Sequence, residues 1–248
     1  GDYALTRAGS DNTNANGDLD LTSGMAVYGA GPTTRILGLS NERVIDLDPG
    51  NTLGHTFQLR ALTVRNGGGP SLFGFGAGIN ASSGSTPGND HLALRAVEVR
   101  NNTTQLAGGG VRSNGPTVII DSIIADNTAA SDGGGLSFGG DANTRVDVAY
   151  TTISGNSSTS SFSGGGGGLH STSNTFVYNS TIAGNQARNN GGGVLSTTAS
   201  GRMNLIGVTI AGNRADADGA NGGNGGGLRI EGNFALITNT VFAGNVIG

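Results

Sequence analysis

The sequence predicts an all-β protein: a single-stranded, right-handed parallel β-helix (β-solenoid) with about 29 residues per rung. Three observations predict this fold. A phrase of glycines, alternating apolar residues and an asparagine recurs along the chain at a period typical of stacked repeats. Within each copy the apolar residues alternate as they do in strands. No stretch of useful length has the 3.6-residue period of a helix.

One copy of the phrase, here called a rung, is defined by an apolar anchor residue that stands three residues before an asparagine. The clearest copy runs from Gly191 to Asn213. From Val99 onward the anchors are separated by 25, 29, 29, 28 and 32 residues. We expect the anchors to form an aliphatic ladder inside the solenoid. They are Val64, Val99, Ile124, Ile153, Ile182, Ile210 and Phe242.

The first 54 residues are the irregular part of the predicted array. Short apolar stretches alternate there with glycine and proline, which is typical of short strands. The regular array begins at His55. We therefore expect one β-helix over residues 1–248, with irregular N-terminal rungs in 1–54 and regular rungs in 55–248.

Three short strands are expected in each regular rung. The residues seven and five positions before the anchor face one side of a first strand, and the anchor and the residue two positions before it face one side of a second. The change from odd to even spacing requires a corner between these strands. An aliphatic residue after each glycine group marks the third strand. These residues are Ile79, Val111, Leu136, Leu169, Val194 and Leu228.

The asparagine that follows each anchor predicts a ladder at a turn. Asparagine tolerates the left-handed conformation, and stacked amides can bond one another along the axis. The alternative is N-linked glycosylation, since the sequences at Asn102, Asn156 and Asn179 are acceptor sites. We favour the structural ladder for the asparagines that follow the anchors. These are Asn102, Asn127, Asn156, Asn185, Asn213 and Asn245.

The glycine groups recur at one register, which indicates that a side chain is excluded there. We favour a tight corner with positive φ. The alternative is a flat strip without side chains on which another chain packs. We do not favour a phosphate-binding loop, because no Gly-Lys-Ser/Thr sequence follows the glycines and we expect no helix to begin there.

Composition excludes two classes of partner. The net charge is −4 and no basic stripe is present, so we expect no nucleic-acid partner. No apolar run approaches the roughly 20 residues of a membrane helix, so we expect no membrane span in this segment. The chain has no cysteine, which is compatible with a secreted protein that needs no disulfides.

A catalytic set is not evident in the sequence. Polysaccharide-degrading enzymes built on β-helices need charged side chains that converge from adjacent rungs. The positions six and four residues before the anchor form no such column, although Arg60 and Arg95 are neighbours. The three histidines are isolated, and no nucleophile motif is present. We predict no catalytic residue, and the candidates for the enzymatic alternative are Arg60, Arg95, Asp46 and Asp48.

Acidic residues offer the only metal candidates. Two pairs stand at strand spacing: Asp18 with Asp20, and Asp46 with Asp48. Asp216 and Asp218 lie in a segment that faintly resembles an oxygen-ligand calcium loop, but the following GGNGGGLRI lacks the aspartate of a calcium-binding nonapeptide. We favour a solvated strand or turn for each pair and predict no cofactor, with Asp216 and Asp218 kept as weak calcium candidates.

The repeat is similar to the GGA[ILV] and FxxN repeats of chlamydial polymorphic outer membrane proteins, and the segment from Phe242 to Asn245 matches FxxN. The segments YALTRAGSDNTNANGDLDL, VYGAG, TTRILG, ERVIDLDPG and LTVRNGGG resemble the bacterial CSLREA-domain β-helix proteins. The resemblance implies a large secreted or surface-anchored repeat protein. The CSLREA motif itself is absent and lies upstream in that family, so we do not take Gly1 as the native start.

Our functional hypothesis is a non-enzymatic β-solenoid, extracellular or on a bacterial cell surface: a stalk, an adhesin passenger or a fibre subunit. The last rung has no amphipathic cap, so we expect continuation into further rungs or head-to-tail self-association. The alternatives are a polysaccharide lyase or hydrolase, and binding of a glycan or cell-surface ligand through the long loops after Asn156 and Asn213.

Overall fold

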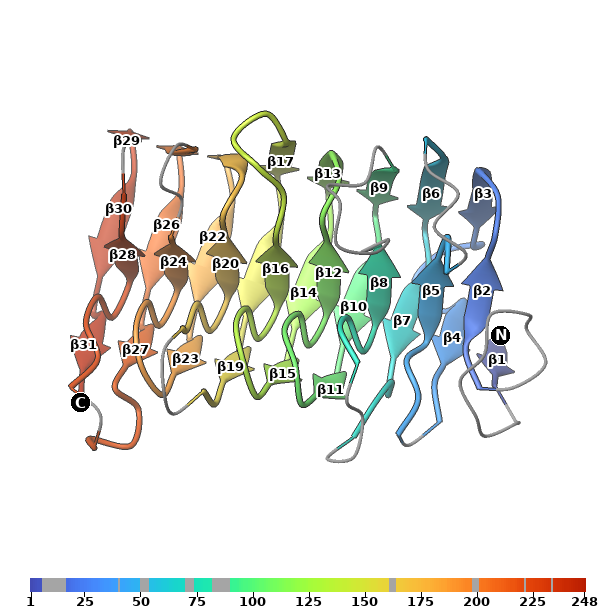
Figure 1. The fold of residues 1–248 in the computed structure, drawn as a ribbon, viewed down its shortest axis with the longest axis horizontal. Helices are drawn as coiled ribbons and strands as arrows, with labels where there is room; N and C mark the ends of the chain where they lie inside the picture. Colours follow the sequence, from blue (N-terminus) through green and yellow to red (C-terminus); the bar gives the residue numbers. More distant parts are fainter. Residues whose placement is uncertain are drawn as a thin grey trace.

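The chain coils into a rod of stacked rungs (Figure 1). The computed structural model describes residues 1–5, 17–39, 41–49, 54–69, 74–81, 90–160, 164–197, 201–220, 222–232 and 234–248. These residues form strands and no helix, in a parallel β-solenoid of about 7 turns with about 29 residues per turn. The predicted fold class is therefore confirmed. The described part of the chain also has no helix with the length and hydropathy of a membrane span.

Sheet A contains the anchors, and all its strand pairs are parallel. It has nine strands, in the order β1 (Asp2–Ala4), β4 (Arg35–Leu37), β7 (Thr63–Arg65), β10 (Glu98–Arg100), β14 (Ile123–Ala125), β18 (Thr152–Ser154), β22 (Thr181–Ala183), β26 (Thr209–Ala211) and β30 (Val241–Ala243).

Sheet B follows the glycine groups. It has eight strands, in the order β2 (Leu19–Leu21), β5 (Ile45–Leu47), β8 (Ile79–Ala81), β12 (Val111–Ser113), β16 (Leu136–Phe138), β20 (Leu169–Ser171), β24 (Val194–Ser196) and β28 (Leu228–Ile230).

Sheet C contains the positions before the corner that precedes each anchor. It also has eight strands, in the order β3 (Met25–Tyr28), β6 (Thr56–Arg60), β9 (His91–Arg95), β13 (Thr117–Ile120), β17 (Arg145–Ala149), β21 (Asn174–Tyr178), β25 (Arg202–Ile206) and β29 (Phe234–Thr238).

Sheet D adds a fourth, two-residue strand to the three strands expected in a rung. It lies directly after each ladder asparagine, where the sequence analysis expected only a turn. It has six strands, β11 (Thr103–Thr104), β15 (Thr128–Ala129), β19 (Ser157–Ser158), β23 (Gln186–Ala187), β27 (Arg214–Ala215) and β31 (Val246–Ile247).

The N-terminal segment belongs to the same solenoid. Its strands β1 to β5 take their places in sheets A, B and C beside the strands of the regular rungs. Sheet D, in contrast, begins only at β11. The two ends of the rod therefore differ, because the described residues before β11 continue this side only through the single bridge between Gly68 and Thr103.

The anchors lie in register and fill the interior. Each anchor is paired with the next along sheet A, from Val64 to Phe242. All are fully buried except Phe242, which is 45% exposed because it stands in the last rung. Burial of a Val, Ile or Leu side chain contributes roughly 1.5–3 kcal/mol, so this column is a main source of cohesion between rungs.

Two corners use the left-handed backbone conformation. The expected corner before the anchor is present, with positive φ at Ala61, Ala96, Asp121, Tyr150, Asn179, Gly207 and Asn239. The second corner falls on the residue before each ladder asparagine, at Asn66, Asn101, Asp126, Gly155, Gly184, Gly212 and Gly244. We had placed the left-handed conformation on the ladder asparagine itself, which is wrong. The glycine or short polar residue before it makes the turn, which leaves the asparagine free to point inward.

The six asparagines form a continuous hydrogen-bonded column. The Nδ2 and backbone N–H of Asn127 both donate to Oδ1 of Asn156, at 3.0 Å each, and the second Nδ2 proton donates to the carbonyl of Val99 at 2.9 Å. The same contacts recur at every step from Asn102 to Asn245. The first five asparagines are fully buried. Each of their side chains is fully satisfied without water.

The glycine groups make room for this column. The first glycine of each group has positive φ, as expected of a tight corner, for example +66° at Gly133. The third glycine faces the asparagines: a Cβ on Gly135 would lie 2.7 Å from the Gly168 carbonyl oxygen and 2.9 Å from Cγ of Asn156. The glycine group and the asparagine are thus two halves of one packing arrangement.

Asn156→Ala tests the ladder. We expect it to lower the free energy of unfolding by about 3 kcal/mol, because it leaves the buried amide donors of Asn127 without an acceptor. Thr152→Ala, at an exposed position of the same rung, is the control and should change stability by less than about 0.5 kcal/mol. Urea denaturation followed by circular dichroism measures both. Equal losses in the two variants would contradict the role of the ladder.

Two glycine substitutions separate steric exclusion from backbone conformation. Gly212 has φ +61° and open space around its Cβ position, so Gly212→Ala should cost only the roughly 1–2 kcal/mol of a left-handed alanine. Gly135→Ala should cost more, about 3 kcal/mol, because its Cβ meets backbone and the buried asparagine. Thermal unfolding gives the order of the two losses, and the reverse order would contradict the packing described above.

Candidate functional site

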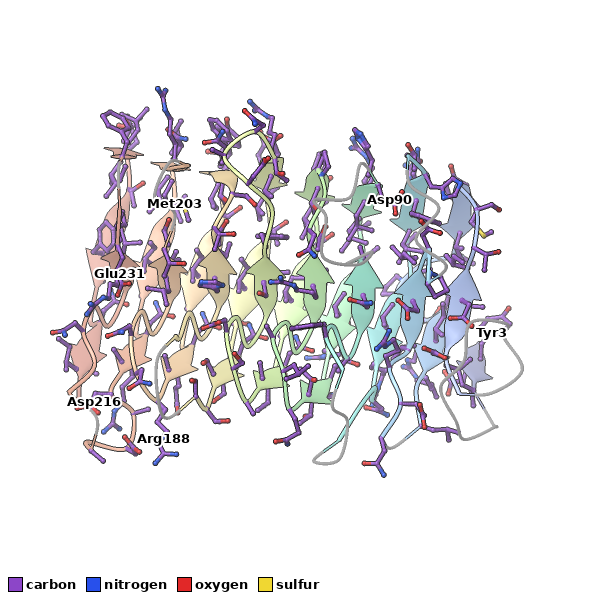
Figure 2. The ribbon with its side chains drawn as sticks, in the orientation of Figure 1. Tyr3, Asp90, Arg188, Met203, Asp216 and Glu231 are labelled. Carbon is purple, nitrogen blue, oxygen red and sulfur yellow. The ribbon has the colours of Figure 1, made fainter. Side chains whose placement is uncertain are left out.

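A polar column runs along the outer face of sheet B, where Figure 2 shows side chains projecting from the front of the rod. The middle residue of each strand points outward, because the residues on either side of it face the core. These middle residues are paired in register from rung to rung. They are Asp20, Asp46, Asn80, Arg112, Ser137, His170, Leu195 and Arg229.

Sequence reasoning missed this column. We searched the positions six and four residues before the anchor, and these lie on the outer face of sheet C. The signal that would have found the column is the second residue after each glycine group, which is polar in most rungs. The search therefore covered the outer face of sheet C and did not extend to the neighbouring sheet.

The N-terminal end of the column is an acidic cluster of Asp18, Asp20 and Asp46. One carboxylate oxygen from each lies within 4.8 Å of the others, and all three residues are buried. Arg43 contacts Asp46 through Nη1, and its Nε lies 3.9 Å from Asp18 Oδ2. Asn80 Nδ2 donates to Asp46 Oδ1 at 2.8 Å. The fold thus joins carboxylates that the sequence placed in two separate pairs.

A second group of titratable side chains lies just after the end of β5, where Asp48, His55 and Asp90 meet. The backbone N–H of His55 donates to Asp90 Oδ1 at 2.7 Å, and His55 Nδ1 lies 3.9 Å from Asp48 Oδ2. Figure 2 labels Asp90 beside β6 and β9. The sequence analysis treated His55 as isolated, which is wrong, because the partners that the solenoid brings to it come from neighbouring rungs.

Burial dominates the electrostatics of both groups. Burial, together with the neighbouring charge of Asp20, raises the pKa of Asp18 to about 7. Burial also raises the pKa of Asp46, against the opposing charge of Arg43. The pKa of Asp90 is raised chiefly by burial, and in part by its side-chain hydrogen bond with Asp48. Such carboxylates can hold protons or a cation, and a hydrogen-bonded carboxyl pair has the groups needed for acid–base chemistry.

The middle of the column is basic and hydroxylic. Arg112 Nη1 donates to Ser137 Oγ at 2.7 Å, and the guanidinium lies over the ring of Phe75. His170 Nε2 and Thr197 Oγ1 are 3.0 Å apart. Burial lowers the pKa of both His170 and Arg112, and Asp132 opposes this in each case. His170 is thereby held neutral at physiological pH.

The other predicted candidates lie elsewhere. Arg60 and Arg95 are neighbours in register, as expected, but they are exposed on sheet C while Asp46 lies on sheet B. Asp218 pairs with Arg188, its Oδ2 being 2.5 Å from Nε. Asp216 is buried in the same loop, where Figure 2 labels it with Arg188 below sheet D. Neither aspartate belongs to a group of three metal-ligating side chains among the residues described.

The acceptor asparagines for glycosylation differ in accessibility. Asn102 and Asn156 are fully buried in the ladder, so their amides are inaccessible in the folded chain. Asn179 is exposed at the corner before its anchor. The two long loops fall partly outside the described residues, at 161–163 and at 221.

No protein-family model, no curated protein and no solved structure matches this chain.

His170→Gln tests the electrostatics of the column. The unfolded chain binds a proton at His170 near pH 6.5 while the buried imidazole resists it, so this contribution to stability is present above pH 6.5 and is lost as the pH falls below it. We expect the advantage of the parent over the variant to shrink between pH 7.5 and pH 5, by at most about 1.4 kcal/mol per pH unit.

The difference between the two proteins isolates His170. Asp18, Asp46 and Asp90 have raised pKa values and act in the opposite direction, since they hold protons in the fold, but they are common to both proteins. Urea denaturation at each pH gives the two free energies. A difference that does not change with pH would contradict a neutral, buried His170.

Proposed function

We propose that the chain is part of an extracellular or cell-surface β-solenoid with a structural or adhesive role, such as a stalk, an adhesin passenger or a fibre subunit. One observation carries the proposal: within the part of the chain that the structure describes, the strands at both ends of the rod pair with a neighbour on one side only (Figure 1). These are β1, β2 and β3 at one end and β28, β29, β30 and β31 at the other. Open edges pair with other strands unless something blocks them.

The C-terminal end is built like an interior layer. Large apolar side chains whose counterparts in earlier rungs are buried are half exposed here, including Ile237 and Phe242. The exposed apolar residues of this rung are Phe234, Leu236, Ile237, Val241, Phe242, Val246 and Ile247. A contiguous apolar surface of this kind marks an interaction site.

The hydrogen-bonding groups of this end favour one occupant, a further rung that has its own ladder asparagine. In every earlier step the backbone N–H and Nδ2 of an asparagine donate to the next Oδ1. The corresponding donors of Asn245 have no such acceptor among the described residues. No described residue at the N-terminal end of a second copy offers such an asparagine, because the equivalent position is Leu39 in the rung of β4 and Gly67 in the rung of β7.

The sequence resemblance supports the location. The GGG and I-x-x-N repeat and the N-terminal segments are similar to bacterial repeat proteins that are secreted or surface-anchored. The repeat itself is used almost wholly for stacking, which suits a rod that holds other parts at a distance.

Extending the chain by one rung tests the proposed occupant. A copy of residues 217–248 fused after Gly248 places a new asparagine where Asn245 can donate to it. We expect amide hydrogen exchange at Asn245 to slow at least tenfold, since its N–H gains the new asparagine as an acceptor, whereas the N–H of Val246 already donates to the Asn213 carbonyl. The control is the same extension with alanine at the new asparagine. Equal protection in both fusions would contradict the ladder as the determinant of docking.

Electron microscopy of the native material tests the role. Antibodies against the recombinant chain, with immunogold labelling of intact cells, should mark rods or fibres at the cell surface. Labelling confined to the cell interior, or a free globular particle, would contradict the proposal.

A second candidate is a carbohydrate-active enzyme, and one observation favours it: Asp48, His55 and Asp90 converge beside Asp46. Turnover of acidic polysaccharides that is lost in Asp90→Asn and kept in Arg60→Ala would support this candidate. No turnover on a broad panel of glycans would exclude it.

A further inference from the structure

Three carboxylates share one buried place on the outer face of sheet B. Asp20 in β2 and Asp46 in β5 are register partners, and Asp18 stands directly before β2. All three are at least nine-tenths buried. Their oxygens approach within 4.8 Å of one another. Like charges held this close in a buried place repel strongly unless a positive group lies between them.

The described part of the chain places one guanidinium beside these carboxylates. Arg43 is the one cation that forms an ion pair with these carboxylates in the described part of the chain. It is committed to Asp46 through Nη1, and Asn80 Nδ2 bonds the other oxygen of Asp46. One guanidinium therefore faces three carboxylates.

Asp18 supplies an independent observation. Its side chain has no exposed surface, yet neither of its oxygens makes a hydrogen bond to any described residue. Its nearest cation is Nε of Arg43, at 3.9 Å, beyond hydrogen-bonding distance. The carboxylate is directed toward Asp20 and Asp46, since its oxygen belongs to the same group. A buried carboxylate without hydrogen bonds is costly unless it is paired or binds a metal.

We propose that Asp18, Asp20 and Asp46 bind a divalent cation and that the ion is calcium. All three ligands are oxygens, which hard cations prefer. Two oxygens that share one calcium ion at bonds of about 2.3–2.6 Å lie at most about 5 Å apart, and these three oxygens lie within 4.8 Å of one another. Magnesium demands near-ideal octahedral geometry and gives up its waters reluctantly, so three carboxylates gathered from two rungs suit calcium better.

The cation joins two rungs. Asp18 and Asp20 belong to the first strand of sheet B and Asp46 belongs to the second, so the ion fastens the N-terminal end of the rod on the side away from the anchors. The described residues of this end include no strand of sheet D and no ladder asparagine. Calcium at the acidic cluster performs there the cross-rung role that the asparagines perform in the rest of the chain.

Calcium titration of the full-length chain tests the proposal. The protein is stripped with EDTA, returned to metal-free buffer and titrated with calcium chloride by calorimetry. We expect one site per chain, a higher melting temperature with calcium than with EDTA, and at least tenfold weaker binding of magnesium. Asp18→Asn should weaken calcium binding at least tenfold while leaving the melting temperature in EDTA unchanged or higher, because the repulsion is relieved.

The control variant is Asp147→Asn, which removes one negative charge from an aspartate on sheet C that pairs with Arg145. It should bind calcium as the parent does. If Asp18→Asn fails to fold, Asp20→Asn replaces it in the same titration. No binding at millimolar calcium, or equal affinity in the parent and in the cluster variant, would overturn the proposal.

Discussion

The structure depends on one cross-rung interaction, the hydrogen-bonded column of buried asparagines. Each asparagine from Asn127 to Asn213 accepts two hydrogen bonds from the preceding rung and donates to a backbone carbonyl on one side and to an asparagine side chain on the other, for example from Asn156 to the Ile124 carbonyl and to Asn185. The column fixes the register of every rung from Asn102 onward, because a slip by one residue would leave buried amides without partners. It also explains the glycines. No side chain fits over the amides, so the residue opposite each asparagine is Gly78, Gly110, Gly135, Gly168, Gly193 or Gly227.

Because the repeat is used for stacking, specific chemistry lies outside it. The outer face of sheet B is the place where the solenoid tolerates variation, since its middle residue touches neither the anchors nor the ladder. The N-terminal rungs use that freedom for carboxylates and the central rungs use it for Arg112, Ser137 and His170. The two ends of the rod are the other variable places. In the described part of the chain, strands of sheet D reach the C-terminal end but not the N-terminal end, which gives the rod a direction.

The fold was predictable because stacking imposes a period that a single sequence displays. The anchors, the corner before them and the three main strands follow from spacing alone. The two-residue strands of sheet D were not predicted, since a pair such as Thr103–Thr104 is too short to show a periodicity. Such a pair is recognised as a strand only through its pairing with the equivalent residues of the next rung. The left-handed residue was misplaced by one position, because asparagine suits both roles and only packing shows that Asn102 points inward. The acidic cluster was predicted in part. The sequence showed the pairs that begin at Asp18 and Asp46 but not that the two pairs lie side by side. That contact, and the contact of His55 with Asp90, depend on the register between rungs.

Side-chain amide exchange tests the central role of the ladder most directly. The measurement uses an NMR sample labelled with ¹⁵N-asparagine. In the buried column each Nδ2 group has two protein acceptors, and this holds for Asn102, Asn127, Asn156, Asn185 and Asn213. We predict that their Nδ2 protons exchange with solvent orders of magnitude more slowly than those of the exposed Asn179. Exchange of the ladder amides as fast as that of Asn179 would contradict the account.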